Sequence, residues 1–242
     1  MNLGGDERIY PASMTKIMTA LLTIENLPDL NETITVPEDI FEELTAQDAS
    51  VAGFNPYEQP TVRDLLYGVL LPSGADACET LARAVGGSEE GFVAMMNQKA
   101  EELGLTNTHF ENCTGLHNDN HYSTCRDIAV LMSECLKSDT FREIVTREVY
   151  TTEATASHPE GITLYDTMLH RFTSYEMSTT LENGAVIEGG KTGFTDEAGQ
   201  CLVSFAEYGG EEYILVTAEA MTDSGSAVDS IADASTVYGR LQ

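Results

Sequence analysis

Apolar positions in the first half of the chain recur every three or four residues, which is the spacing of amphipathic helices. In the earliest such segment Ile17, Leu21 and Ile24 fall on one face. A capping box at 61–64, Thr-Val-Arg-Asp, predicts the start of another helix because its first and last side chains can satisfy helix-terminal N–H groups. The pattern predicts helices over 13–25, from 61 to about 71, and over 76–86, 88–104 and 123–137.

After residue 139 the spacing changes to the alternation that is typical of strands. Residues 148–153 alternate, and the β-rich runs 199–206 and 213–220 flank Gly209-Gly210, which favours an antiparallel hairpin. Strands joined by a tight turn, with helices elsewhere, predict an α/β chain of the α+β kind. The same reading predicts a short strand over 33–36, an irregular stretch over 154–184 and a closing helix over 226–241.

Composition narrows the range of partners. The 242 residues suit one large domain or two interleaved subdomains. Asp and Glu number 40 against 12 Lys and Arg, and the formal charge of -28 would repel nucleic acid and anionic membrane surfaces. In a chain so poor in lysine, each one is a candidate for a specific role; the four are Lys16, Lys99, Lys137 and Lys191.

Cysteine spacing and the chain ends carry less information. The five cysteines form no C-x-x-C pair, which argues against a zinc or redox motif, and Cys78, Cys125 and Cys135 are predicted to be small buried thiols on helices. No apolar run approaches the roughly 20 residues that cross a membrane. The chain opens directly on domain-like sequence without a leader, which suggests a trimmed or incomplete gene product.

Ser13-Met14-Thr15-Lys16 is the first candidate for chemistry. Residues three apart on a helix lie on one face, so the Lys16 amine should reach the Ser13 hydroxyl. A serine hydroxyl needs such a base to act as a nucleophile, and a lysine can serve if burial or a nearby positive charge lowers its pKa. The unpaired N–H groups of a helix start could also stabilise a developing oxyanion.

Two further motifs could complete such a site. Lys191-Thr192-Gly193 follows two glycines and precedes the hairpin, so it could carry a positive charge on an edge strand, while Gly193 lets a substrate approach the backbone. Ser73, before Gly74, stands at the corner between two predicted helices, where a hydroxyl could relay a proton. Ser-x-x-Lys, a Ser-led triplet and Lys-Thr-Gly in this order are the signature of penicillin-binding proteins and class A β-lactamases.

The chain resembles the D-alanyl-D-alanine carboxypeptidases, the low-molecular-weight penicillin-binding proteins of serine-peptidase family S11. The matching stretches are YPASMTK (10–16), TVRDLLYGVLLPSG (61–74), GLHNDNHYST (115–124) and GKTGFTDEAG (190–199). The resemblance implies the serine β-lactamase and transpeptidase fold, with an antiparallel sheet flanked by helices beside an all-helical region. It implies one catalytic domain over 1–242, with a helical subregion at about 26–147 between sheet-side segments 1–25 and 148–242.

The resemblance also implies roles for individual residues. Ser13 would attack the carbonyl of the penultimate D-Ala of a peptidoglycan pentapeptide, with Lys16 as general base, Ser73 as proton relay and Lys191 as electrostatic partner. The backbone N–H groups of Ser13 and Phe194 would form the oxyanion hole. Thr192, Gly193, Phe194 and Arg171 would bind the substrate.

The implied partners are peptidoglycan pentapeptides ending in D-Ala-D-Ala and, as inhibitors, β-lactam antibiotics. No cofactor is expected. The substrate lies outside the cytoplasm, so the protein should be exported, with any membrane attachment through segments absent from this chain. A metal held by His117 and His121, with Asp119 between them, is not expected because no third ligand is in view.

Two departures from the family pattern keep alternatives open. The second motif has Ala75 where the family has Asn, which removes an amide that would bind the substrate backbone. A strand hairpin that precedes the start of this chain in the family is missing. The alternatives are therefore a catalytically weak protein that binds wall peptides or β-lactams, and a β-lactamase-like hydrolase.

Overall fold

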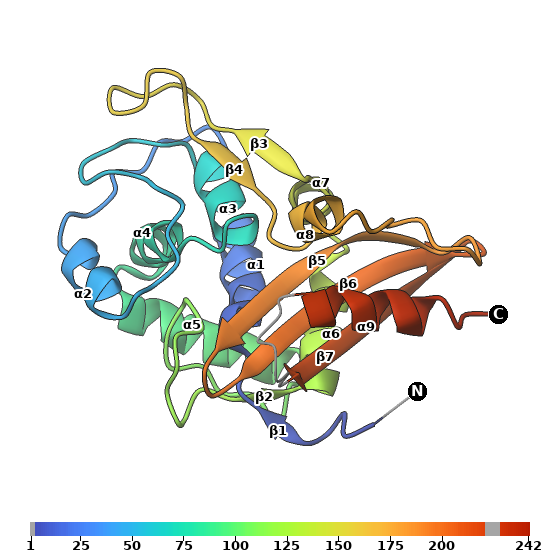
Figure 1. Ribbon diagram of the computed structural model, residues 1–242. Helices are drawn as coiled ribbons and strands as arrows, with labels where there is room; N and C mark the ends of the chain where they lie inside the picture. The colour runs from blue at the N-terminus through green and yellow to red at the C-terminus, as the bar shows by residue number, and fades with distance from the viewer. Residues whose placement is uncertain (1–2, 221–227) are drawn as a thin grey trace.

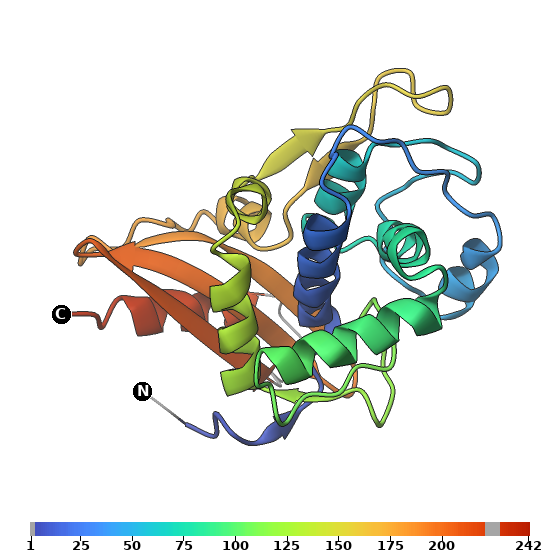
Figure 2. The ribbon, with the colours of Figure 1, turned by 180° about the vertical axis from the view of Figure 1, so that it is seen from behind.

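The three longest strands form one antiparallel sheet, which is the frame of the right-hand half of the molecule in Figure 1. The computed structural model describes residues 3–220 and 228–242. Strands β5 (Val186–Thr195), β6 (Gly199–Tyr208) and β7 (Glu211–Ala220) pair in the order β5-β6-β7, so β5 lies at an edge. Helix α9 (Val228–Tyr238) covers one face and α6 (Cys125–Cys135) the other, as the front and back views show (Figures 1 and 2).

A central helix joins this sheet to the helical half. Helix α1 (Lys16–Asn26) continues from a 3₁₀ turn, η1 (Ala12–Thr15), and its first eight residues are all buried. A helix buried on every side needs neighbours all round, and Figure 2 shows α1 enclosed in this way. Its neighbours are α3 (Val62–Leu70), α4 (Ala75–Gly86), α5 (Glu89–Glu102), α6 and α7 (Asp139–Val145).

The remaining elements are short. Helix α2 (Ile40–Ala46) packs on α4, and α8 (Leu169–Ser174) contacts α9. Strands β1 (Arg8–Ile9) and β2 (Ser123–Thr124) pair next to the start of α6, and β3 (Val149–Thr151) pairs with β4 (Thr163–Tyr165).

Most of the predicted elements are confirmed. The capping box is present, since the Thr61 side chain accepts the Asp64 N–H (3.1 Å) and the Asp64 carboxylate accepts the Thr61 N–H (3.2 Å). The helices predicted over 13–25, 76–86 and 88–104 and the strands of the hairpin all form, within a few residues of the expected bounds. The closing helix forms as well, although 226–227 lie outside the described residues.

Two predictions are wrong, and one confirmed helix has a shifted start. Residues 33–36 run beside 57–62 but form only an isolated bridge, because Pro60 has no N–H to continue a ladder. The helix expected from residue 123 begins at Cys125, since Ser123 and Thr124 pair with β1 and the Thr124 side chain caps the helix. The stretch 154–184 is not irregular throughout: it holds β4 and α8, both too short to show a period in the sequence.

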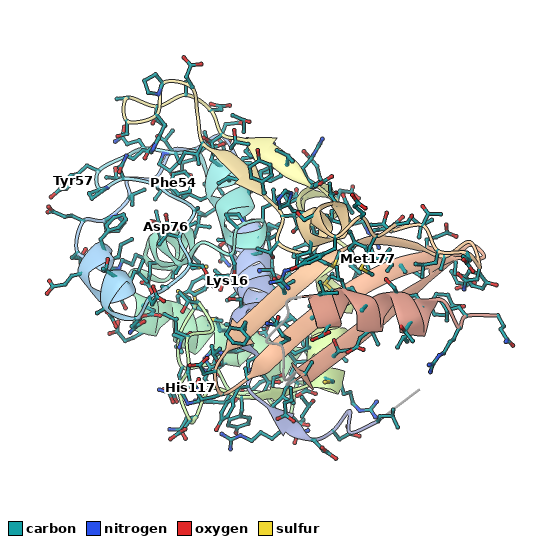
Figure 3. The ribbon with its side chains drawn as sticks, viewed as in Figure 1. Lys16, Phe54, Tyr57, Asp76, His117 and Met177 are labelled. Carbon is teal, nitrogen blue, oxygen red and sulfur yellow. The ribbon has the colours of Figure 1, made fainter. Side chains whose placement is uncertain are left out.

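One buried carboxylate fixes a long loop beside α4. Asp76, in the first turn of α4, is fully buried and accepts backbone N–H groups of Ala52 (2.7 Å), Gly53 (3.0 Å) and Phe54 (3.1 Å). Three donors from one loop that converge on one carboxylate hold that loop in place. Figure 3 shows Asp76 and Phe54 on the same side of the helical half.

Replacing Asp76 with Ala should therefore destabilise the protein by about 3 kcal/mol or more, because three buried N–H groups lose their acceptor. Urea unfolding monitored by circular dichroism measures the change. Asp233→Ala, at an exposed position of α9, is the matched control and should change stability by less than about 0.5 kcal/mol. Equal effects of the two substitutions would contradict this role for Asp76.

Candidate active site

The turn from η1 into α1 brings Ser13 and Lys16 together. Lys16 Nζ lies 3.2 Å from Ser13 Oγ and donates a hydrogen bond to the Thr114 carbonyl at 2.6 Å. Lys16 is 3% exposed, whereas Ser13 is only partly buried, so the hydroxyl is accessible and the amine is not. Figure 3 shows Lys16 in the middle of the molecule, between the helical half and β5. The predicted pairing of hydroxyl and amine is present in the structure.

The loop 112–122 holds this turn in a strained shape. Ala12 has φ 45°, a left-handed value that costs a non-glycine residue about 1–3 kcal/mol. A Cβ on Gly115 would lie 1.9 Å from the Ala12 carbonyl oxygen, so only glycine allows the loop to pack so closely on the turn. The loop is also tied to α1 itself, because Thr19 donates to the Cys113 carbonyl at 2.6 Å.

His121 is part of the same attachment. Its Nδ1 accepts the Glu111 N–H (3.2 Å), so Nε2 carries the proton and donates to Thr15 Oγ1 (2.8 Å). Burial lowers the pKa of His121 to about 3, which keeps the ring neutral. Both nitrogens are occupied, so His121 offers none to a metal ion. His117 instead packs edge-on against Tyr10.

Strand β5 supplies the second amine. Lys191 is 1% exposed and donates to the Thr192 carbonyl at 3.1 Å. The strand packs directly on η1: a Cβ on Gly193 would lie 3.0 Å from the Ser13 backbone nitrogen. A side chain at position 193 would thus crowd the N–H group that is expected to stabilise an oxyanion.

The two amines share one buried environment. Burial lowers the pKa of Lys16, and it also lowers the pKa of Lys191, with the charge of Lys16 as the next cause. The charge of Asp166, in contrast, raises the pKa of Lys191. Burial and the charge of Lys16 together lower the pKa of Lys191 to about 7, so the two amines do not both stay fully protonated near neutral pH. In the state in which Lys16 is the neutral amine, it can accept a proton from Ser13.

The remaining predicted residues lie at the corner before α4, on β5 and on α8. Ser73, with φ 67°, is buried at the corner before α4, and its hydroxyl has no hydrogen-bond partner in the described part of the chain. Phe194 is 54% exposed on β5. Arg171, on α8, is partly buried, and its charge contributes to lowering the pKa of Lys191. Thr192 is buried and its hydroxyl lies 2.6 Å from that of Thr167.

Several contributors were missed by the sequence analysis. Thr114 acts through a backbone carbonyl, which no residue pattern reveals. Asp166 and Thr167 lie in the stretch that was interpreted as irregular, so nothing marked them as neighbours of β5. All five cysteines are free thiols; Cys78 and Cys135 are buried as predicted, while Cys125 is only partly so.

An acidic cluster contacts the loop 112–122 at Cys113. Glu79 on α4, Glu89 on α5 and Cys113 are the one group of potential metal ligands found within residues 3–220 and 228–242. The Cys113 thiol donates to Glu79 (3.4 Å) and its backbone N–H to Glu89 (3.2 Å). Burial, and then the charge of Glu89, raises the pKa of Glu79 to about 8. A protonated Glu79 thus helps to hold the residue that precedes Thr114.

The pKa of Glu79 predicts a pH-dependent stability. In the folded state this carboxyl keeps its proton up to about pH 8, while in the unfolded chain it loses the proton near its ordinary 4.5. The stabilisation is complete below 4.5 and is lost as the pH rises through about 8. Glu79→Gln should flatten this loss, measured by urea unfolding across that range. The exposed Glu101→Gln should keep the wild-type slope; an unchanged slope in the Glu79 variant would refute the assignment.

Comparison with known proteins agrees with this geometry. The profile of the D-alanyl-D-alanine carboxypeptidase family, peptidase family S11, matches residues 2–222. The chain is 36% identical over 222 residues to the D-alanyl-D-alanine carboxypeptidase DacF of Bacillus subtilis strain 168, covering 91% of this chain and 54% of DacF. It is 36% identical over 217 residues to the D-alanyl-D-alanine carboxypeptidase of Streptomyces sp. strain K15, covering 86% and 72%.

Solved structures show the same fold. The crystal structure of the Streptomyces K15 DD-transpeptidase matches with a TM-score of 0.83 at 32% identity, covering 99% of this chain and 90% of that one. A D-alanyl-D-alanine carboxypeptidase from Mycobacterium tuberculosis H37Rv matches with a TM-score of 0.78 at 27% identity, covering 96% and 81%.

Helices around an antiparallel sheet form the fold that this chain shares with solved DD-peptidases, and in this chain a Ser-x-x-Lys turn packs against the edge strand of that sheet. The chain belongs to the D-alanyl-D-alanine carboxypeptidase family. The family and the fold class predicted from the sequence are thereby confirmed. The chain spans about half the length of DacF.

Proposed function

We propose that this protein is a serine-type D-alanyl-D-alanine carboxypeptidase, which removes the terminal D-Ala from peptidoglycan stem peptides through an acyl-enzyme. The observation that carries the proposal is the contact between the accessible Ser13 hydroxyl and the buried Lys16 amine, 3.2 Å apart, beside a second buried amine on β5. Family membership supports the choice of substrate.

Acylation begins with the attack of Ser13 Oγ on the carbonyl carbon of the penultimate D-Ala, while Lys16 Nζ takes the hydroxyl proton. The carbonyl oxygen becomes an oxyanion, and the N–H groups of Ser13 and Phe194 stabilise it. The peptide C–N bond then breaks. Ser73 passes the proton from Lys16 to the departing amine, and free D-Ala leaves. Water, deprotonated by Lys16, then attacks the ester carbonyl carbon, the acyl–Oγ bond breaks, and Lys16 returns the proton to Ser13 Oγ.

Recognition of the substrate rests on its terminal carboxylate. Lys191 contributes positive charge, Thr192 a hydroxyl donor and Arg171 a guanidinium group near Lys191. Gly193 leaves room for the substrate beside the strand backbone. A penicillin presents a carboxylate and a reactive carbonyl to the same groups, so β-lactams would acylate Ser13 and inhibit the enzyme.

This substrate places the protein outside the cytoplasm, as an exported enzyme of the cell wall. The helices that the structure describes include none long and apolar enough to cross a membrane. We propose no cofactor, because the steps above use only the side chains of Ser13, Lys16, Ser73 and Lys191 with their neighbours, the backbone donors and water.

Incubation with penicillin should add one penicillin mass to the intact wild-type protein, and Ser13→Ala should add none, because the attacking oxygen is gone. The wild type should also release D-Ala from an Nα-acylated Lys-D-Ala-D-Ala peptide. Acylation without D-Ala release would favour the weak binding protein suggested by Ala75. Neither acylation nor release from folded wild type would refute the enzyme proposal.

Gly193→Ala should slow acylation by penicillin about tenfold or more, since the new Cβ would stand 3.0 Å from the Ser13 nitrogen and 3.2 Å from the Pro11 carbonyl oxygen. Stopped-flow or timed mass spectrometry measures the rate, and the melting temperature separates this effect from unfolding. A wild-type acylation rate in a normally folded variant would show that β5 need not approach Ser13 so closely.

A further inference from the structure

Thr167 joins the two sides of the candidate site. Its backbone N–H donates to the Leu71 carbonyl (3.1 Å), two residues before Ser73, and its hydroxyl lies 2.6 Å from the Thr192 hydroxyl on β5. The residue thus touches both the corner that presents Ser73 and the strand that presents Lys191. None of the motifs recognised in the sequence includes it.

The segment around Thr167 is held firmly. Asp166 is 1% exposed, and its carboxylate accepts the N–H groups of Met168 (2.8 Å) and Leu169 (2.6 Å), which starts α8. The Asp166 N–H donates to the Glu148 carbonyl at 2.8 Å. Bonds on both sides fix the backbone of Thr167, and its hydroxyl is hydrogen-bonded to that of Thr192.

Two hydroxyls 2.6 Å apart share one hydrogen bond, and either can donate. If Thr192 donates, its proton points to Thr167 and is not available to a substrate. If Thr167 donates, the Thr192 proton remains available to an acceptor. In the described part of the chain Thr192 Oγ1 is the sole side-chain partner of the Thr167 hydroxyl, so Thr167 has no competing acceptor for its own proton.

Resting on the function proposed above, we propose that Thr167 is a positioning residue that determines specificity for a free carboxylate. Its hydroxyl donates to Thr192 Oγ1 and thereby directs the Thr192 proton to the terminal carboxylate of the substrate. Lys191, next to Thr192 on β5, favours the same arrangement, because its protonated form draws a carboxylate to this place and offers no acceptor.

The test compares Thr167→Val, which keeps the shape and removes the hydroxyl, with Thr167→Ser, which keeps the hydroxyl. The probes are an Nα-acylated Lys-D-Ala-D-Ala peptide with a free carboxylate and the same peptide with a C-terminal amide. For the carboxylate peptide, Thr167→Val should lower kcat/KM about tenfold, chiefly through KM, since the Thr192 hydroxyl loses the hydrogen bond that fixes its orientation toward the carboxylate. For the amide peptide, Thr167→Val should change kcat/KM little. Thr167→Ser should keep kcat/KM near the wild-type value for both peptides.

A double-mutant cycle with Thr192→Val separates positioning from structural support. If Thr167 acts through Thr192, its substitution should have no further effect once Thr192 lacks the hydroxyl. Equal losses for the two peptides, an undiminished kcat/KM in Thr167→Val, or additive losses in the cycle would overturn the proposal. Should Thr167→Val not fold, Thr167→Ala is measured in its place with the same outcomes.

The failure of this proposal is distinguishable from failure of the proposed function. Penicillin labelling of Ser13 and D-Ala release are measured first on the wild type. If both are absent, the enzyme function and the role of Thr167 fall together. If both are present and the peptide selectivity of Thr167→Val equals that of wild type, the role of Thr167 alone is refuted.

Discussion

Burial of two amines within reach of each other's charge is the constraint on which the candidate site depends. An exposed lysine would remain protonated at neutral pH and could not accept a proton from serine. Here desolvation lowers the pKa of both Lys16 and Lys191. Lys16 donates a hydrogen bond to the Thr114 carbonyl, and Lys191 donates one to the Thr192 carbonyl. Enclosure of α1 by helices, with β5 packed on the η1 turn at its start, creates the dry environment that this arrangement requires.

Close packing of backbone on the η1 turn positions the remaining groups of the candidate site. Two glycines, Gly115 and Gly193, allow a loop and a strand to press on η1 from different directions, where any Cβ would come within 3.0 Å of backbone atoms. The loop carries the acceptor for Lys16 and the strand carries Lys191. Segments that are distant in sequence thus meet at one turn, and the acidic cluster of Glu79 and Glu89 secures the loop.

The sequence was informative where chemistry follows a local pattern. Ser13 and Lys16 are three residues apart on a helical turn, so their contact follows from helix geometry, and the Thr61 capping box predicted the start of α3. It was silent where contacts depend on tertiary packing. The Thr114 carbonyl and the Thr167 hydroxyl act from loops whose positions depend on the whole fold, and six-residue α8 is too short for a periodic signal.

The left-handed backbone at Ala12 and Ser73 has a consequence for how the molecule opens. Each residue stores conformational energy that the surrounding contacts must overcome, and each stands directly beside or at a proposed catalytic hydroxyl. Releasing either corner would relieve that energy, so local opening at these two turns is favoured ahead of global unfolding. Loss of reactivity toward an acylating probe would then precede loss of secondary structure as the protein is warmed.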